Sequence, residues 1–198
     1  MNYSIKVVKF KDGKENVKAF VSVVFGKVFK VTNIKIMENS KNGTLFVSMP
    51  QYKTKTDGKT VYKDIFNPVT KEFREQLYTD ILDTFKKLSE EKSEQGEYNF
   101  NRGESVKFSV KVIPYKKKVG NLRAFVHICF NDSFAVNTAN ILQGKQKLFI
   151  SMPSYKTKKK DDNGKEIYQE ICYPVTKDFR EQLYSQILST YEKTSEEF

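Results

Sequence analysis

One segment of this chain of 198 residues occurs twice. Residues 68–82 return as residues 174–188, and 12 of the 15 positions are identical. Shared helical composition does not produce such agreement, so one unit has been duplicated. Shorter matches come upstream in the same order, among them the run that ends at Pro50 and the run that ends at Pro153. The spacing of about 105 residues is too long for a solenoid repeat, so each copy is predicted to be a domain with its own core.

The duplication also predicts the domain boundaries. The two domains are expected over residues 1–88 and 106–198, and the polar, acidic segment 89–105 is expected to be a linker. Each copy is small for a self-sufficient core, so burial of one copy against the other would stabilise both. A linker of this length reaches roughly 50 Å when extended, more than the diameter of either domain. The two copies are therefore predicted to fold back on each other as an intramolecular pseudo-dimer.

Within each copy, the pattern of apolar residues predicts strands first and a helix last. Residues 18–25 alternate between an apolar side and a mixed side, which is typical of a β-strand. Further β-branched runs with Asn-Gly or Asp-Gly turns complete an antiparallel sheet of about four to five strands. Thr70 and Thr176 are the predicted N-caps of the closing helices, in which apolar residues recur every four positions from Phe73 onward. The fold class is therefore α+β, with a sheet and a C-terminal α-helix in each of two tandem domains.

The charge of the chain favours a polyanionic partner. Lys and Arg together number 35 against 24 Asp and Glu, which leaves a net charge of +11. Solubility alone also explains such a surface, so the charge by itself does not decide the function. No apolar run approaches the roughly 18 residues of a membrane span, and the N-terminus lacks the pattern of a signal peptide. We therefore expect no membrane insertion and a cytoplasmic protein.

The residue inventory gives little support to catalysis. The one histidine, His127, is expected on the surface side of its strand rather than in a catalytic site. Cys129 and Cys172 align with Val24 and Phe66 of the first copy, so both are interpreted as small buried hydrophobes and not as a disulfide or a metal pair. No glycine-rich loop follows a predicted strand and opens a helix. We expect no enzyme activity, no cofactor and no metal.

Two lysine-rich loops, which follow Pro50 and Pro153, are the candidate binding sites. Lysines neutralise phosphates and tyrosines stack on unpaired bases, so the loops fit DNA or RNA. A solvated loop whose charges do nothing specific is the alternative, and it stays open. The loop of the second copy is longer and has more lysines, which predicts the stronger site there. With the lysines at the helix starts, the predicted nucleic-acid contacts are Lys53, Lys55, Lys59, Lys71, Lys156, Lys158, Lys159, Lys160 and Lys177, with Tyr52 and Tyr155 as candidate stacking residues.

An arginine near the start of each predicted helix is the sharpest single anomaly. At about 100° per residue, Arg74 falls inside the apolar arc of its helix, and Arg180 does so in the second copy. A guanidinium on the core side needs a partner. We predict structural ion pairs of Arg74 with Asp64 and of Arg180 with Glu170, while phosphate binding by the arginines stays an alternative.

The order of these short motifs resembles that of the SpoVG family, the stage V sporulation protein G or septation regulators of bacteria. The shared pattern runs from Ala-Phe-Val through Phe-Val-Ser-Met-Pro and a Lys-Thr pair to a glycine turn, a proline and the closing helix, over residues 4–88 and again over residues 108–193. The resemblance implies small proteins that pair into homodimers and bind DNA or RNA as regulators, with the two copies here in place of the two subunits. Where the family commonly has Lys-Arg after Met-Pro-Ser, this chain has Tyr-Lys in both copies, which favours non-specific over sequence-specific binding.

Two functions therefore compete. The first is a nucleic-acid-binding regulatory protein of the septation and sporulation type, with DNA or RNA as its partner. The alternative is a non-enzymatic scaffold in which the charge serves solubility and exposed sheet edges recruit other proteins. Which nucleic acid is bound, and whether the tandem chain associates further, stays open.

Overall fold

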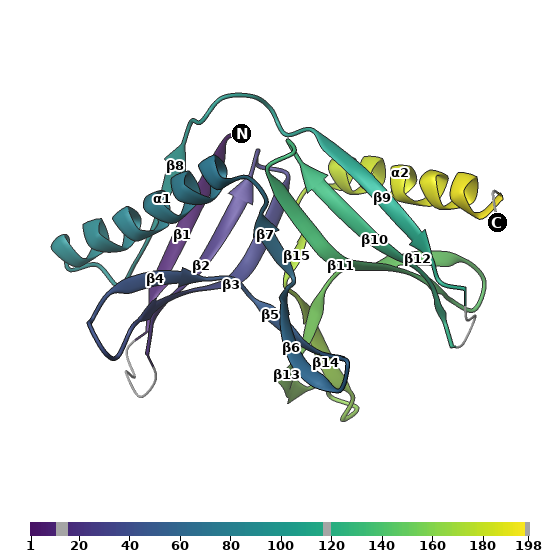
Figure 1. The fold of residues 1–198 in the computed structure, drawn as a ribbon, viewed down its shortest axis with the longest axis horizontal. Coiled ribbons are helices and arrows are strands. Elements are labelled where there is room, and N and C mark those ends of the chain that lie inside the picture. The colour runs from purple at the N-terminus through teal and green to yellow at the C-terminus, as the bar shows by residue number, and fades with distance from the viewer. Residues whose placement is uncertain (11–15, 117–119, 197–198) are drawn as a thin grey trace.

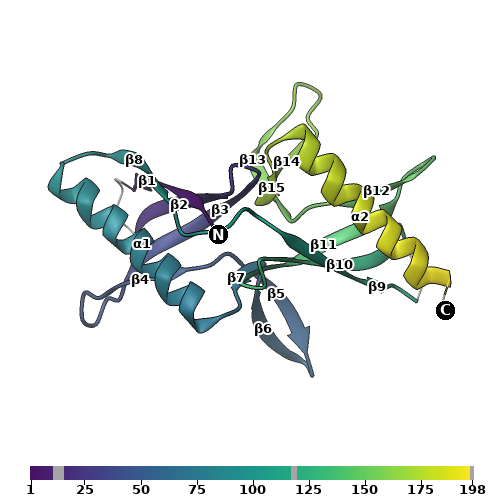
Figure 2. The same ribbon diagram turned by 90° about the horizontal axis from the view of Figure 1, so that it is seen from above.

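The alternating segments of the two copies fold into two large antiparallel sheets, of six and five strands in the described part of the chain. Each of these sheets is covered on one face by its own helix (Figure 1). The computed structural model describes residues 1–10, 16–116 and 120–196. Seen from above, the two helices lie apart, each over its own half of the molecule (Figure 2). The predicted fold class, α+β with two tandem halves, is confirmed.

The first half is a series of antiparallel strands followed by a small hairpin, a short strand and a helix. In its second strand, the residues from Val17 to Phe25 are buried at every odd position and not at the even ones, as the alternation predicts. The elements are β1 (Tyr3–Lys9), β2 (Val17–Phe25), β3 (Phe29–Glu38), β4 (Leu45–Ser48), the hairpin β5 (Gln51–Thr56) and β6 (Lys59–Asp64), β7 (Phe66–Pro68) and α1 (Lys71–Glu90).

The second half repeats this order. Its second and third strands are joined by a tight turn in which Asn131 and Asp132 have φ angles of 46° and 49°. Two residues with positive φ give the turn that fits the twist of a hairpin, and Asn and Asp tolerate this conformation. The elements are β9 (Phe108–Pro114), β10 (Leu122–Phe130), β11 (Phe134–Gln143), β12 (Leu148–Ser151), the hairpin β13 (Ser154–Lys160) and β14 (Glu166–Glu170), β15 (Cys172–Pro174) and α2 (Lys177–Glu196).

Each helix begins at its predicted N-cap. The hydroxyl oxygen of Thr70 accepts a hydrogen bond from the amide of Phe73 at 3.2 Å, and Thr176 accepts one from Phe179 at 3.3 Å. Each bond satisfies one of the N–H groups that a helix start leaves without a partner. Beyond the cap, the apolar stripe turns toward the sheet, and Leu77 of α1 is fully buried there.

The two halves exchange their short strands. β7 leaves the first half and pairs with β11 of the second, so that Pro68 lies opposite Phe134. β15 does the reverse and pairs with β3, so that Pro174 lies opposite Phe29. This reciprocity is typical of an isologous dimer interface, here within one chain. The flanking backbone hydrogen bonds also come in matched pairs, each at 2.8 Å: Thr32 N to Ile171 O with Asn137 N to Ile65 O, and Val175 N to Val28 O with Val69 N to Ser133 O.

Four phenylalanines close the core between the halves. Phe25 lies against Phe134 with ring centroids 4.7 Å apart, and Phe29 lies against Phe130 at 4.6 Å. Phe25 and Phe130 are equivalent positions of the two copies, as are Phe29 and Phe134, so one contact is repeated by the pseudo-twofold axis. All four rings are fully buried. The halves therefore share one continuous core, as expected for the intramolecular pseudo-dimer.

The segment expected to be a linker, residues 89–105, contains a strand that its sequence did not indicate. β8 (Gln95–Phe100) pairs antiparallel with β1 and extends the first sheet. Its mostly polar sequence carries a weak strand signal, because β-branched residues are lacking. Gly96 lets β8 pass close to α1, since a Cβ atom there would come 2.6 Å from the Leu88 side chain. Independent folding of the copies at the expected boundaries stays a prediction.

A buried carboxylate ties this added strand to the first half. Asp80 of α1 is 4% exposed and accepts hydrogen bonds from the Tyr3 hydroxyl at 2.6 Å and from the Arg102 guanidinium at 2.7 and 3.2 Å. Burial, followed by the bond to Asp80, raises the pKa of Tyr3. The second copy has Phe108 and Gln186 at the equivalent positions, so the network breaks the symmetry of the two halves.

The shared core makes a prediction for Phe134→Ala. Truncating a fully buried ring that contacts the other half is expected to lower the free energy of unfolding by about 3 to 5 kcal/mol. Urea unfolding followed by circular dichroism measures this change, and a single transition is expected because both halves lose the same contact. Phe149→Ala removes an exposed ring from the same half and is expected to stay within about 0.5 kcal/mol of the parent. Equal losses for the two variants would contradict this account of the interface.

The carboxylate network makes a prediction for Tyr3→Phe. Losing a buried hydrogen bond to a charged group is expected to cost about 1.5 to 3 kcal/mol of stability. Because the pKa of Tyr3 is raised in the folded state, its contribution is intact below the unfolded value of about 10 and falls as the pH rises above it. The difference in unfolding free energy between parent and variant should therefore shrink at alkaline pH. Tyr98→Phe, which removes an exposed bond to Glu91, is the control and is expected to change little.

Candidate nucleic-acid interface

The two lysine-rich loops are β-hairpins that project from the side of the sheets opposite to the helices (Figure 1). In the first hairpin, Asp57 and Gly58 form a two-residue turn with φ angles of 51° and 76°. An Asp-Gly pair between two strand segments is a strong signal for a hairpin turn of this kind. Lys53 lies opposite Tyr62 and therefore shares a face of the hairpin with it. The lysines of the hairpins that were predicted to contact nucleic acid are all exposed: Lys53 and Lys55 in β5, Lys59 in β6, and Lys156, Lys158, Lys159 and Lys160 in β13.

Acidic residues offset part of the positive charge of each hairpin, and they do so more in the second hairpin. Residues 51–64 contain four lysines and two aspartates, whereas residues 154–170 contain five lysines and four acids. In the second hairpin, Lys156 forms an ion pair with Glu166. The larger number of lysines in the second copy is thus offset within its own strands, and the predicted ranking of the two sites stays a prediction.

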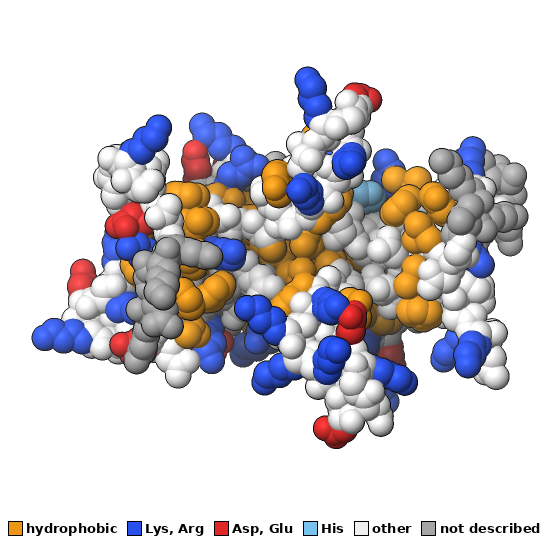
Figure 3. Space-filling view, turned by 90° about the horizontal axis from the view of Figure 1, so that it is seen from below, with side chains coloured by type: hydrophobic (Ala, Val, Ile, Leu, Met, Phe, Trp, Pro, Cys, Tyr) orange, Lys and Arg blue, Asp and Glu red, His pale blue; other side chains and the backbone are white. Residues whose placement is uncertain are grey.

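A cavity of about 550 Å³ lies between the hairpins and the first sheet. Phe20 and Lys35 line it from β2 and β3, Tyr62 enters from β6, and Tyr155 comes from β13 of the other copy. None of the described residues that line it is acidic. Seen from below, the lysine-bearing hairpins stand on either side of a central band of hydrophobic side chains (Figure 3). Tyr155, a predicted stacking residue, therefore lies where lysines and exposed rings meet.

Exposed rings recur at the same positions in both copies. Phe20 is 40% exposed and its equivalent Phe125 is 41% exposed, while Tyr62 and Tyr168 are both 61% exposed. Large apolar groups left open to water at matching places indicate an interaction surface. Sequence reasoning missed Phe20 as a candidate. The signal was present, because a phenylalanine occupies the solvent-facing phase of the alternating strand in each copy.

The lysines at the helix starts belong to a different region. Lys71 lies 3.8 Å from Glu75 and Lys177 lies 3.7 Å from Glu181, each one helical turn further on. The helices that carry them cover the sheet face opposite to the hairpins (Figure 1). The structure therefore does not bring these two lysines together with the hairpin lysines.

The arginines differ from the prediction. Arg74 donates to the carbonyl oxygen of Pro68 at 3.2 Å and Arg180 to that of Pro174 at 3.2 Å, and neither predicted acid, Asp64 or Glu170, is within ion-pair distance of them. Both arginines are exposed, although the phenylalanine that precedes each of them, Phe73 and Phe179, packs against the core. The acids still act nearby. Burial raises the pKa of Tyr78 and Tyr184, and in each case the arginine lowers it and the acid raises it.

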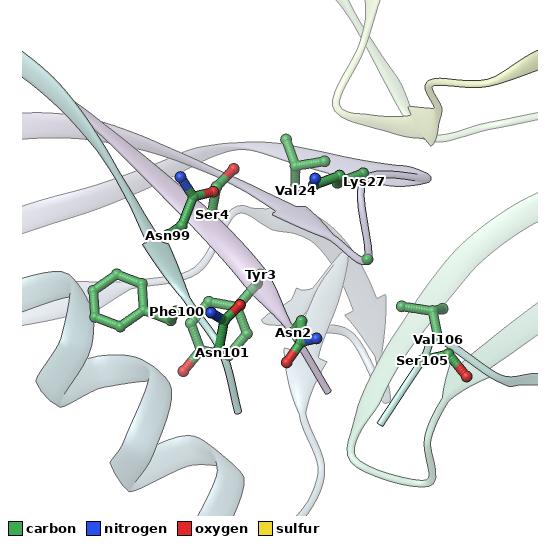
Figure 4. A pocket seen from close by; sticks show the side chains of 11 residues that line it. Asn2, Tyr3, Ser4, Val24, Lys27, Asn99, Phe100, Asn101, Ser105 and Val106 are labelled. Atoms are coloured by element: carbon green, nitrogen blue, oxygen red, sulfur yellow. The ribbon is translucent and has the colours of Figure 1, made fainter. Parts of the chain in front are cut away.

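Other groups offer little chemistry. A cavity of about 350 Å³ lies where the connector between the copies, residues 91–107, passes the turn between β2 and β3 (Figure 4). Among the described residues that line it, Lys27 is the one with a charge. Cys129 and Cys172 are free thiols, and burial raises the pKa of both, although Cys129 is only half-buried. Among the described residues, no cluster of three metal-ligating side chains occurs. Neither helix, within the same residues, is long and apolar enough to cross a membrane.

Comparison with known proteins matches the two halves separately. The SpoVG family model matches residues 1–87 and residues 106–193. "Putative septation protein SpoVG" of Clostridium botulinum (strain Alaska E43 / Type E3) is 36% identical over 78 residues, which is 39% of this chain and 79% of the relative. Proteins of the same name from Treponema denticola and Symbiobacterium thermophilum are 35% identical over 74 residues and 45% identical over 73 residues, in each case 37% of this chain, and 73% and 49% of the relatives. Each aligned stretch is thus no longer than one copy. Because the two segments that the family model matches cover most of the chain, the protein belongs to the SpoVG family and contains its domain twice.

Proposed function

We propose that this chain is a nucleic-acid-binding regulatory protein of the septation and sporulation type. The observation that carries the proposal is the pair of lysine-rich hairpins on one side of the sheets, with exposed tyrosines among the lysines. Cationic side chains neutralise phosphates and release counterions, which supplies most of the affinity of non-specific binding. The net charge of +11 supports the same partner.

Two hairpins in one chain act as a bivalent device. The strand exchange fixes both hairpins to a common core, so a polyanion held by one hairpin meets the other at a high effective concentration. Each hairpin alone offers only a few phosphate contacts. The affinity of the two linked hairpins for one polyanion therefore exceeds the affinity of either hairpin alone.

Lysine-only hairpins favour binding that does not depend on base sequence. Neither residues 51–64 nor residues 154–170 contain an arginine. Lysine contacts phosphate as a point charge, whereas the planar fork of arginine reads guanine or grips phosphate through two parallel bonds. We therefore propose backbone contacts as the main source of affinity.

A protein scaffold is the second candidate, and one observation favours it. The outer edge of β9 pairs with no strand in the described part of the chain, whereas β8 covers the equivalent edge of β1. An open edge of this kind accepts an extended segment of another protein. Such pairing rests on backbone hydrogen bonds, so it is expected to depend little on salt.

Charge reversal on the hairpins separates the two functions. Fluorescence anisotropy of labelled duplex DNA, single-stranded DNA and RNA is measured over a salt series. With four phosphate contacts, the log-log slope on duplex DNA is expected to be about −3.6. Reversing two lysines, in Lys53→Glu with Lys55→Glu or in Lys158→Glu with Lys160→Glu, should weaken binding and reduce that slope by about 1.8.

Two further variants locate the interface. Lys86→Glu with Lys193→Glu makes the same charge change on the helices, and it is expected to alter affinity much less than either hairpin variant. Lys71→Glu with Lys177→Glu tests the helix starts, since a loss as large as that of the hairpin variants would move the interface to the helical side. No binding of any nucleic acid at low salt would contradict the proposed function and favour the scaffold.

A further inference from the structure

The cavity of about 550 Å³ between the hairpins has a lining that suits flat, aromatic ligands. Three exposed rings, Phe20, Tyr62 and Tyr155, converge on it from three different strands. Lys35, directly opposite Phe20 in the sheet register, places a positive charge beside the rings. The volume falls within the range of about 300 to 1,000 Å³ that is typical of ligand sites.

We infer that this cavity receives unpaired bases of a single-stranded nucleic acid, which stack on Phe20, Tyr62 and Tyr155. This inference rests on the proposed function and specifies its substrate class. Every base has a π-face that stacks on an aromatic side chain, whereas a base in a duplex is already stacked between its neighbours. RNA-binding sheets use exposed aromatic residues in the same way.

Charge decides between a nucleic acid and an apolar peptide as the occupant. The described lining has Lys35 as its charged residue and no acid, and Lys53 shares the hairpin face of Tyr62. A strand whose bases enter the cavity therefore carries its phosphates past lysines on the hairpins. Rings and Lys35 inside the cavity, with further lysines on the hairpins outside it, fit a single-stranded polyanion.

Both copies are needed to build the site. Phe20 and Tyr62 belong to the first copy, while Tyr155 reaches the cavity from the hairpin of the second. The second copy keeps the same ring types at Phe125 and Tyr168, with Asn140 in the place of Lys35. The first-copy site therefore combines rings with a cation, which makes it the one to test.

The chain contains no tryptophan, so a single substitution provides a fluorescent probe. In Phe20→Trp, a labelled strand of mixed sequence and about 15 nucleotides should quench the indole emission, because stacked bases are effective quenchers. The same strand annealed to its complement should not. Phe46→Trp is the matched control, since Phe46 is 43% exposed on β4 but does not line the cavity.

Ring deletion provides the second readout. Phe20→Ala and Tyr155→Ala are each expected to weaken binding of the single strand about 5- to 150-fold, the range for losing one stacked base, and to leave duplex binding nearly unchanged. Phe20→Tyr, which keeps a ring, should retain binding, whereas Phe20→Leu should not. Because Tyr155 is an exposed hairpin residue, its variant answers the question even if changes at Phe20 disturb the sheet.

The outcomes separate this inference from the function on which it rests. Single strand and duplex binding with equal affinity, and Phe20→Ala behaving like Phe46→Ala, would overturn the inference and leave nucleic-acid binding by the hairpins intact. Retained affinity in Phe20→Leu would indicate simple apolar contact and would also count against stacking. Absence of binding to either form at low salt would remove both the inference and the proposed function.

Discussion

The reciprocal exchange of β7 and β15 is the constraint on which the rest of the structure depends. Each strand of three residues leaves its own hairpin, pairs with the sheet of the other copy and then starts its helix. Phe66 of β7 is buried against Phe134 by this exchange, with ring centroids 5.6 Å apart. Because the hairpins precede the exchanged strands directly, the exchange also holds both hairpins at the centre of the same side. The candidate interface is therefore a consequence of how the core is closed.

The two halves are equal at their centre and unequal at their outer edges. In the first half, the buried Asp80 gathers Tyr3 and Arg102, and β8 covers the edge of β1. The second half has Phe108 and Gln186 in the equivalent places, and the outer edge of β9 stays unpaired within the described residues. A buried charge is tolerated only with several partners, and the connector between the copies supplies one of them. The asymmetry thus follows from the position of the connector, which lies after one helix and before the other copy.

Local features of the sequence were sufficient to predict the strands and helices, but they did not predict which distant segments pair with each other. Alternation and turn residues predicted the strands, the duplication predicted two halves, and Thr70 and Thr176 predicted both helix starts. The exchange could not be predicted, because the partner of a three-residue strand depends on tertiary packing rather than on its own residues. β8 was missed for its polar composition. Arg74 and Arg180 were misplaced because the face of the helix that is buried is narrower than the apolar arc of the helical wheel; in α1 it centres near Leu77, so Arg74 lies at its edge.

Joining the two copies in one chain changes what a composite site requires. A site built by two separate subunits exists only in the fraction of molecules that is assembled, which depends on protein concentration. Here the cavity is built from Phe20 and Tyr62 of one copy and Tyr155 of the other, and all three are covalently linked. The two copies can also differ in sequence, because a substitution in one copy is not repeated in the other. Lys35, which lines the cavity, is such a difference, because the second copy has the uncharged Asn140 at the equivalent position.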